Sequence, residues 1–292
     1  MTLLLAFLLA QQPDAGADSG TYVREVETWR RAREDRLKAD GGWLTVAGLA
    51  WLAPGRNPFG AAATNAVVLP AHAAPANAGA FVVEGDRVTI EVAPGVAVTR
   101  AGKPVTRALL RSDAGGAEPD VLALGAVTMQ VLSRGDKLAV RIKDMRNPAR
   151  AAFKGLRWYP IDPAWRVTAR FVPHPKPTTL KIDTVVGIQE AMVSPGYAEL
   201  RIAGKTVRLD PVIEPGETNL FFIFRDGTTG RTTYGGGRFL YAEPPRDGRV
   251  VLDFNRAYTP PCGFTAYATC PMPPAVNRLS IEIPAGELSP HR

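Results

Sequence analysis

Residues 134–143 read RGDKLAVRIK, a tight-turn sequence followed by alternating apolar and polar side chains. Leu138, Val140 and Ile142 fall on one face of an extended chain, and Arg141 falls on the opposite face. A period of two is typical of a strand that buries one face and exposes the other to water. We therefore predict a half-buried strand here, with Arg141 on the solvent face.

The same pattern occurs upstream, where residues 84–92 read EGDRVTIEV. Further turn signals follow at residues 94–95 and 101–102, and no long helical pattern separates the segments. Short strands at regular spacing predict a sandwich or barrel and disfavour a parallel α/β fold. We expect a β-sandwich over residues 46–145.

The second half of the chain is also predicted to consist mostly of strands. Residues 220–224 are continuously apolar, as expected of a strand covered on both faces. Residues 250–254 and 279–283 are further candidate strands. Because prolines interrupt residues 144–164, we place a junction there and expect a second β-rich sandwich or barrel-like domain over residues 146–292.

The composition fits a mostly β protein, and the length suggests about two domains. The 292 residues include 28 glycines and 26 prolines, and 46% of them are hydrophobic. This combination excludes a disordered chain, a collagen and a bundle of long helices. The net charge is +7, but the sequence has no basic stripe with interleaved aromatic residues, so we expect no nucleic-acid partner.

The N-terminus carries the pattern of a secretory leader. Within residues 1–17, an apolar run at 3–10 precedes small residues at 15–17, and the run is too short to span a bilayer. This pattern predicts a periplasmic or secreted protein without a transmembrane segment. A cytoplasmic location is the alternative.

A linker and an amphipathic helix are expected over residues 18–45. The helical pattern places Tyr22, Val26, Trp29 and Leu37 near one face, with charged residues opposite. Gly41-Gly42 ends the helix. We expect this helix to pack on the domain that follows it.

The most unusual stretch is residues 253–274, DFNRAYTPPCGFTAYATCPMPP, which follows the glycine-rich residues 226–240. Proline fixes the backbone and removes donors, so this polar segment is predicted to be rigid. Cys262 and Cys270 are the two cysteines of the chain, and their number and spacing predict a disulfide in an oxidising compartment. A pair of reduced, buried thiols is the alternative.

We infer that this segment binds a small anionic ligand or a protein partner. A guanidinium offers a planar fork of donors to a carboxylate or phosphate, and a rigid loop holds polar groups at low entropic cost. The predicted ligand-binding residues are Arg238, Asn255, Arg256, Tyr267 and Thr269.

Two other functions stay open. One is a hydrolase-type enzyme, with Asp226 or Asp253 as general base and Tyr234 or Tyr258 as hydrogen-bond donor. The sequence lacks a G-x-S-x-G elbow, a P-loop and an H-E-x-x-H motif, and we predict no cofactor and no metal site. The other is a purely structural two-domain β scaffold, in which these side chains pair with one another.

Two resemblances accompany these patterns. Residues 253–274, with 229–240 and 42–52, closely resemble the domain-of-unknown-function family DUF1684 over about residues 25–287; this resemblance implies no activity. Residues 55–70, GRNPFGAAATNAVVLP, are weakly similar to the opening of a forkhead-associated domain, a phosphothreonine-reading β-sandwich. Because residues 76–81 lack the Ser-x-x-His of that family, this similarity implies the sandwich fold and not phosphopeptide binding.

Overall fold

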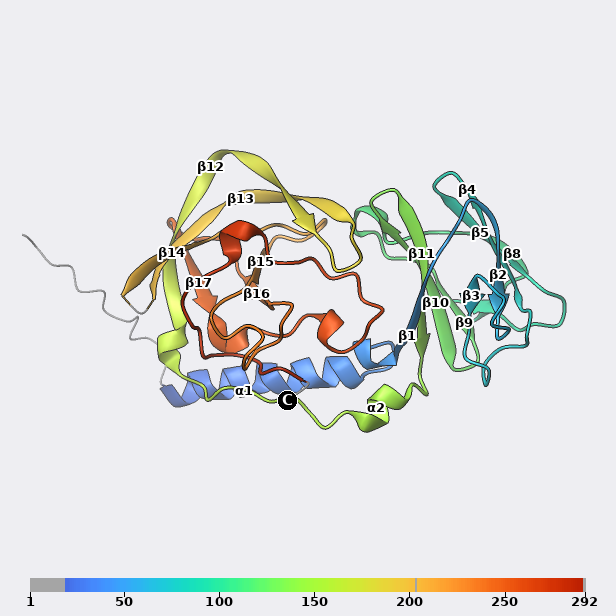
Figure 1. Cartoon of the computed structure of the whole chain (residues 1–292), viewed down its shortest axis with the longest axis horizontal. Coiled ribbons are helices and arrows are strands. Elements are labelled where there is room, and N and C mark those ends of the chain that lie inside the picture. The colour runs from blue at the N-terminus through green and yellow to red at the C-terminus, as the bar shows by residue number, and fades with distance from the viewer. Residues whose placement is uncertain (1–18, 203, 291–292) are drawn as a thin grey trace, which may run out of the picture.

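Most of the chain forms β-strands in four sheets, preceded by one long helix (Figure 1). The computed structural model describes residues 19–202 and 204–290, so the predicted leader at 1–17 lies outside the described residues. The strands fall into two groups that lie side by side, β1 to β11 and β12 to β17. The prediction of a mostly β protein with an N-terminal helix is confirmed. No helix in the described ranges is long and apolar enough to cross a membrane.

Two sheets make up the N-terminal group and enclose one hydrophobic core. Phe59, Phe81, Ile90, Met129 and Val140 are among its fully or nearly fully buried members. The six-stranded sheet has the order β1 (Val46–Trp51), β11 (Lys137–Asp144), β10 (Val127–Arg134), β9 (Val121–Leu124), β6 (Thr99–Arg100) and β7 (Lys103–Pro104). The five-stranded sheet has the order β3 (Val67–Val68), β2 (Gly55–Gly60), β4 (Gly79–Glu84), β5 (Arg87–Val92) and β8 (Arg107–Leu110).

The predicted turns and strands of this group form where expected, with one difference. Gly135 adopts a φ of 59° in the turn that joins β10 to β11, a left-handed conformation that favours glycine. On β11, however, Ala139 and Arg141 are buried as well as Val140 and Ile142. The prediction that Arg141 faces solvent is therefore wrong, because other segments of the chain cover the outer face of this strand. The resemblance to forkhead-associated domains stays a prediction.

The C-terminal group surrounds two further hydrophobic clusters. Every side chain of β15 is buried, as its apolar sequence predicted. Residues 279–283, predicted as a strand, are irregular, and the Ile283 N–H donates to the Asp226 carboxylate at 2.6 Å instead of to a strand. One sheet of this group has four strands in the order β14 (Lys205–Leu209), β13 (Gln189–Ile202), β12 (Arg166–Asp183) and β17 (Arg249–Asp253). The other sheet has two strands, β15 (Leu220–Phe224) and β16 (Arg238–Ala242).

Strands β12 and β13 form a long hairpin that arches over the C-terminal group (Figure 1). Its turn reaches the N-terminal group, because a Cβ atom on Gly135 would lie 3.3 Å from Ile188 Cγ2. The short helix α2 (Pro148–Ala152) lies in the connection between the groups. The separate cores support a domain boundary near residue 145, which stays a prediction.

Helix α1 (Ser19–Lys38) runs beneath the C-terminal group, not against the sandwich that follows it in sequence (Figure 1). Its buried stripe consists of Tyr22, Val26, Arg33 and Leu37. The Tyr22 hydroxyl donates to Asp253 at 2.8 Å, which explains why the helix packs on residues far along the chain. The expected packing on the following domain is therefore wrong.

Candidate functional site

A cleft of about 1850 Å³ lies between the two groups of strands. The end of α1 and the residues after it contribute Arg33 and Trp43, and the N-terminal group contributes the β10–β11 turn and the loop at Ala114–Gly116 (η2). From the C-terminal group, the cleft is lined by Glu190, Glu214, Phe221, Phe239, Tyr241, Arg256, Tyr258, Thr269 and Cys270.

Arg141 is the most unusual residue of this cleft. It is 6% exposed, and its guanidinium carbon lies 4.9 Å from the ring centroid of Trp43. Within residues 19–202 and 204–290, neither its Nε nor its Nη2 has a hydrogen-bond partner. Burial, and then the positive charge of Arg134, lowers the pKa of Arg141 to about 10. A buried cation without a counter-ion is costly, and an anion in the cleft would offset that cost.

The neighbouring Arg134, in contrast, has carboxylate and hydroxyl partners. Its Nη1 lies 2.8 Å from Asp113 Oδ2, and its Nε donates to Thr269 Oγ1 at 3.0 Å. Glu190 lies 3.8 Å from the same Nε, and burial raises the pKa of this carboxyl above its usual value. Arg134 therefore joins the two sides of the cleft, and nearby carboxylates neutralise its charge.

Aromatic rings form another wall of the cleft. Tyr241 stacks on Phe221 at 4.6 Å and on Tyr258 at 6.4 Å between centroids, while Phe239 meets Tyr258 edge to face at 5.9 Å. The Tyr241 hydroxyl donates to Glu214 Oε2 at 2.5 Å. Burial is the main cause that raises the pKa of both tyrosines, so both hydroxyls stay protonated. This aromatic wall, Phe221, Phe239, Tyr241 and Tyr258, combines apolar faces with hydroxyl groups.

Two predicted site residues, Asp226 and Arg238, form a buried ion pair away from the cleft. Both side chains are fully buried, and Arg238 Nη2 lies 3.0 Å from Asp226 Oδ2. Arg238 also donates to the backbone oxygens of Ile283 and Ala285. This pair holds the irregular C-terminal segment against β16.

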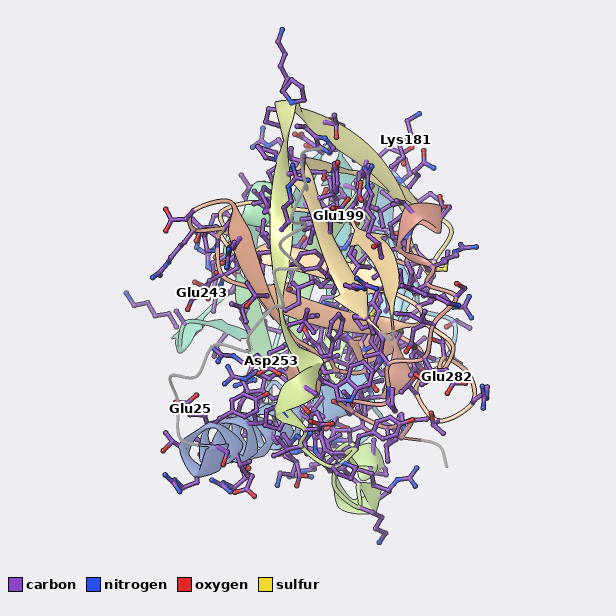
Figure 2. The ribbon with its side chains drawn as sticks, turned by 90° about the vertical axis from the view of Figure 1, so that its left-hand side faces the viewer. Glu25, Lys181, Glu199, Glu243, Asp253 and Glu282 are labelled. Atoms are coloured by element: carbon purple, nitrogen blue, oxygen red, sulfur yellow. The ribbon has the colours of Figure 1, made fainter. Side chains whose placement is uncertain are left out.

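Asp253 and Asn255, also predicted as site residues, bind helix α1. Asp253 accepts from Tyr22, and Asn255 Nδ2 donates to the Tyr22 hydroxyl at 2.9 Å and to the Asp162 oxygen at 2.8 Å. Figure 2 shows Asp253 close above α1, on which Glu25 is labelled. Arg256 pairs with Asp253 at 3.2 Å and borders the cleft.

The remaining predicted residues divide between the cleft and its surroundings. Tyr258 and Thr269 line the cleft, whereas Tyr267 is 41% exposed outside that lining. The Tyr234 hydroxyl donates to the Cys262 carbonyl at 3.0 Å and is likewise outside the lining. Arg256, Tyr258 and Thr269 are thus the predicted site residues that line the cleft.

Cys262 and Cys270 are free thiols, so the predicted disulfide is wrong. The two residues are adjacent, as their spacing suggested, but the Cys262 N–H donates to Cys270 Sγ at 3.2 Å and the sulfurs are not bonded. The thiol of Cys270 donates a hydrogen bond that lowers the pKa of Cys262 to about 7, and the pKa of the buried Cys270 rises in turn. The number and spacing of the cysteines predicted that the two residues lie close together, but they did not determine whether the thiols are oxidised.

Sequence reasoning missed Arg134, Arg141, Glu214 and Tyr241. Arg141 carried no signal, because a polar residue between two buried positions of a strand usually faces water. The ring that lies against its guanidinium, Trp43, belongs to a segment distant in sequence. Among the described residues, no group of three or more His, Cys, Asp or Glu is placed to hold a metal ion.

Comparisons with known proteins give a family match and a similar solved structure. One similar solved structure is the solution NMR structure of an uncharacterized protein from gene locus rrnAC0354 of Haloarcula marismortui, which is 31% identical. The match covers 49% of this chain and 80% of that chain, with a TM-score of 0.42. No curated protein matches the chain. Residues 151–288 match the model described as "Protein of unknown function (DUF1684)", and this range includes the polar segment at 253–274. The chain therefore belongs to the DUF1684 family.

Proposed function

We propose that the chain is a binding protein for a small anionic ligand, which binds in the cleft with its anionic group on Arg141. The observation that carries this proposal is the buried guanidinium of Arg141, whose Nε and Nη2 lack partners among the described residues. Hydrogen bonds to a charged partner are stronger than neutral ones, especially in a site that water enters poorly. Arg141 therefore replaces Arg238, which was predicted from the sequence, as the arginine that binds the ligand. Two other predicted residues, Thr269 and Arg256, still border the site.

The hydrolase alternative has less support. Asp226 is committed to Arg238, and Asp253 to Tyr22 and Arg256, and neither carboxylate lines the cleft. These contacts suit a structural role for the two aspartates. A structural role does not account for Arg141, because its Nε and Nη2 make no hydrogen bond to any described residue.

Titration with acetate and with inorganic phosphate tests the proposal, with the indole N–H signal of Trp43 in NMR spectra as the reporter. Because the guanidinium lies over this ring, ligand binding is expected to shift the signal. Arg141→Gln is expected to weaken binding about 10- to 100-fold, the equivalent of losing hydrogen bonds to a charged group. Arg107→Gln, a change on the surface of the same group of strands, is the matched control and leaves binding unchanged. Equal affinities in Arg141→Gln and the parent protein would refute the proposal.

We also propose that the protein acts in the periplasm or outside the cell. The support is the leader pattern at residues 1–17, since the free thiols remove the argument from a disulfide. Fractionation of cells that produce the full chain is expected to find it outside the cytoplasm. Replacing two leucines of the run at 3–10 by arginine is expected to retain it inside, because an export signal requires an apolar core. A full chain found in the cytoplasm would establish the alternative location.

A further inference from the structure

We infer that the ligand is a planar aromatic monocarboxylate, with its carboxylate on Arg141 and its ring system beside Trp43 and the aromatic wall. This inference rests on the proposed function and assigns the chemical class of the ligand. Three features carry it: the geometry of the unpaired guanidinium atoms, the aromatic residues of the cleft, and the carboxylates in the cleft lining.

The unpaired atoms of Arg141 suit a carboxylate. Nε and Nη2 lie on the same edge of a guanidinium, and their two parallel N–H bonds match the two oxygens of one carboxylate. Both atoms are buried and lack hydrogen-bond partners in the described structure. A bidentate pair with a carboxylate would satisfy both donors at once.

The surface next to this carboxylate position is aromatic and continuous with the wall. Trp43 lies under the guanidinium, and both Trp43 and Tyr258 pack against the hydrophobic cluster that contains Phe221 and Phe239. Tyr241, which stacks on Phe221 and Tyr258, is 40% exposed. Aromatic rings gain stability from stacked or edge-to-face contacts with another ring, beyond the area they bury. The cleft, at about 1850 Å³, also leaves room for a body much larger than acetate.

Carboxylates of the cleft lining disfavour a second negative charge on the ligand. Arg33 Nε lies 3.3 Å from the buried Glu287 carboxyl, and the Arg33 guanidinium lies over the Tyr258 ring at 4.5 Å. Glu214 and Glu243 also line the cleft. A ligand with two anionic groups would place one of them near these carboxylates, where like charges repel.

Affinities for five probes test the class: acetate, benzoate, 2-naphthoate, benzyl alcohol and terephthalate. We expect 2-naphthoate to bind at least tenfold more tightly than acetate, and benzoate at least tenfold more tightly than benzyl alcohol, which lacks the charge. Terephthalate, a dianion with the same ring, is expected to bind more weakly than benzoate.

Two variants separate the ring from the carboxylate. Tyr241→Leu is expected to weaken 2-naphthoate binding at least threefold and to leave acetate binding unchanged, whereas Tyr267→Leu, an equally exposed tyrosine outside the lining, changes neither. Circular dichroism establishes that each variant is folded. Equal affinities for acetate and 2-naphthoate, both lost in Arg141→Gln, would overturn the aromatic class and leave the proposed function intact. Affinities that do not depend on Arg141 for any probe would overturn the proposed function, and the inference with it.

Discussion

At the residue scale, the buried arginines of the described structure differ in what neutralises them. Arg238 is paired with Asp226, and Arg33 with Glu287, and all four residues belong to networks that hold segments together. Arg141 has no such pairing at Nε or Nη2 within the described ranges. A cation that stays buried without a partner costs stability, so we expect Arg141 to serve a ligand rather than the fold.

This difference predicts opposite effects of one substitution at two positions. Arg141→Leu is expected to raise the free energy of unfolding by about 1 kcal/mol, because it removes an unpaired buried charge. Arg238→Leu is expected to lower it by about 3–5 kcal/mol, because Asp226 would remain buried and uncompensated. Urea unfolding of both variants measures the two changes. A clear loss of stability in Arg141→Leu would show that this arginine supports the fold.

The same residues show how far the sequence could predict the site. The turn at Gly135 and the buried positions Val140 and Ile142 followed from alternation, because strand period and turn chemistry are local properties. The burial of Arg141 did not, because it depends on residues distant in sequence, such as Trp43. Arg238, in the glycine-rich stretch before the polar segment, was predicted to bind a ligand, yet Asp226, twelve residues away, already neutralises it.

At the scale of elements, helix α1 is held by polar groups as much as by apolar ones. Arg33 takes the place of an apolar residue in the buried stripe, where it pairs with Glu287 and donates to the Thr259 oxygen at 2.8 Å. The helical period of the sequence predicted the buried stripe of α1, but it did not predict the C-terminal residues on which that stripe packs. Arg33 could not be assigned from sequence, because its carboxylate partner is 254 residues away.

Glu287 makes the docking of α1 dependent on pH. Burial is the main cause that raises the pKa of Glu287 from 4.5 to about 7, and Arg33 opposes this rise. Between pH 4.5 and 7 the folded state holds a proton that the unfolded chain has released, so stability falls as pH rises through this window. The loss amounts to about 3 kcal/mol above pH 7. Glu287→Gln is expected to flatten the pH profile of unfolding between 4.5 and 7. An unchanged slope in this variant would assign the pH dependence to other groups.

At the scale of the whole molecule, Arg134 connects the two groups of strands. It is the last residue of β10, pairs with Asp113 of its own group, and contacts Thr269 and Glu190 of the other. The hairpin turn near Ile188 adds an apolar contact beside it. The width of the cleft therefore depends on a small number of contacts between two separate cores.

Arg134→Ala is expected to loosen the loop at residues 261–271 while leaving both cores folded. Loss of the hydrogen bond to Thr269 and of the nearby ion pairs is expected to speed amide hydrogen exchange in this loop about tenfold, which corresponds to about 1.4 kcal/mol. Arg111→Ala, which removes a surface pair with Asp120, is the matched control. Exchange rates that match in the two variants would show that the loop is held by its own prolines.

The contacts of α1 also bear on how the protein is made. Tyr22 donates to Asp253, which follows 231 residues later, and Arg33 needs Glu287, which follows 254 residues later. As the nascent chain leaves the ribosome, this helix emerges well before the residues on which it docks. The helix must therefore wait undocked while more than 200 further residues are synthesised, and copies that terminate within this stretch expose its apolar stripe to chaperones and proteases.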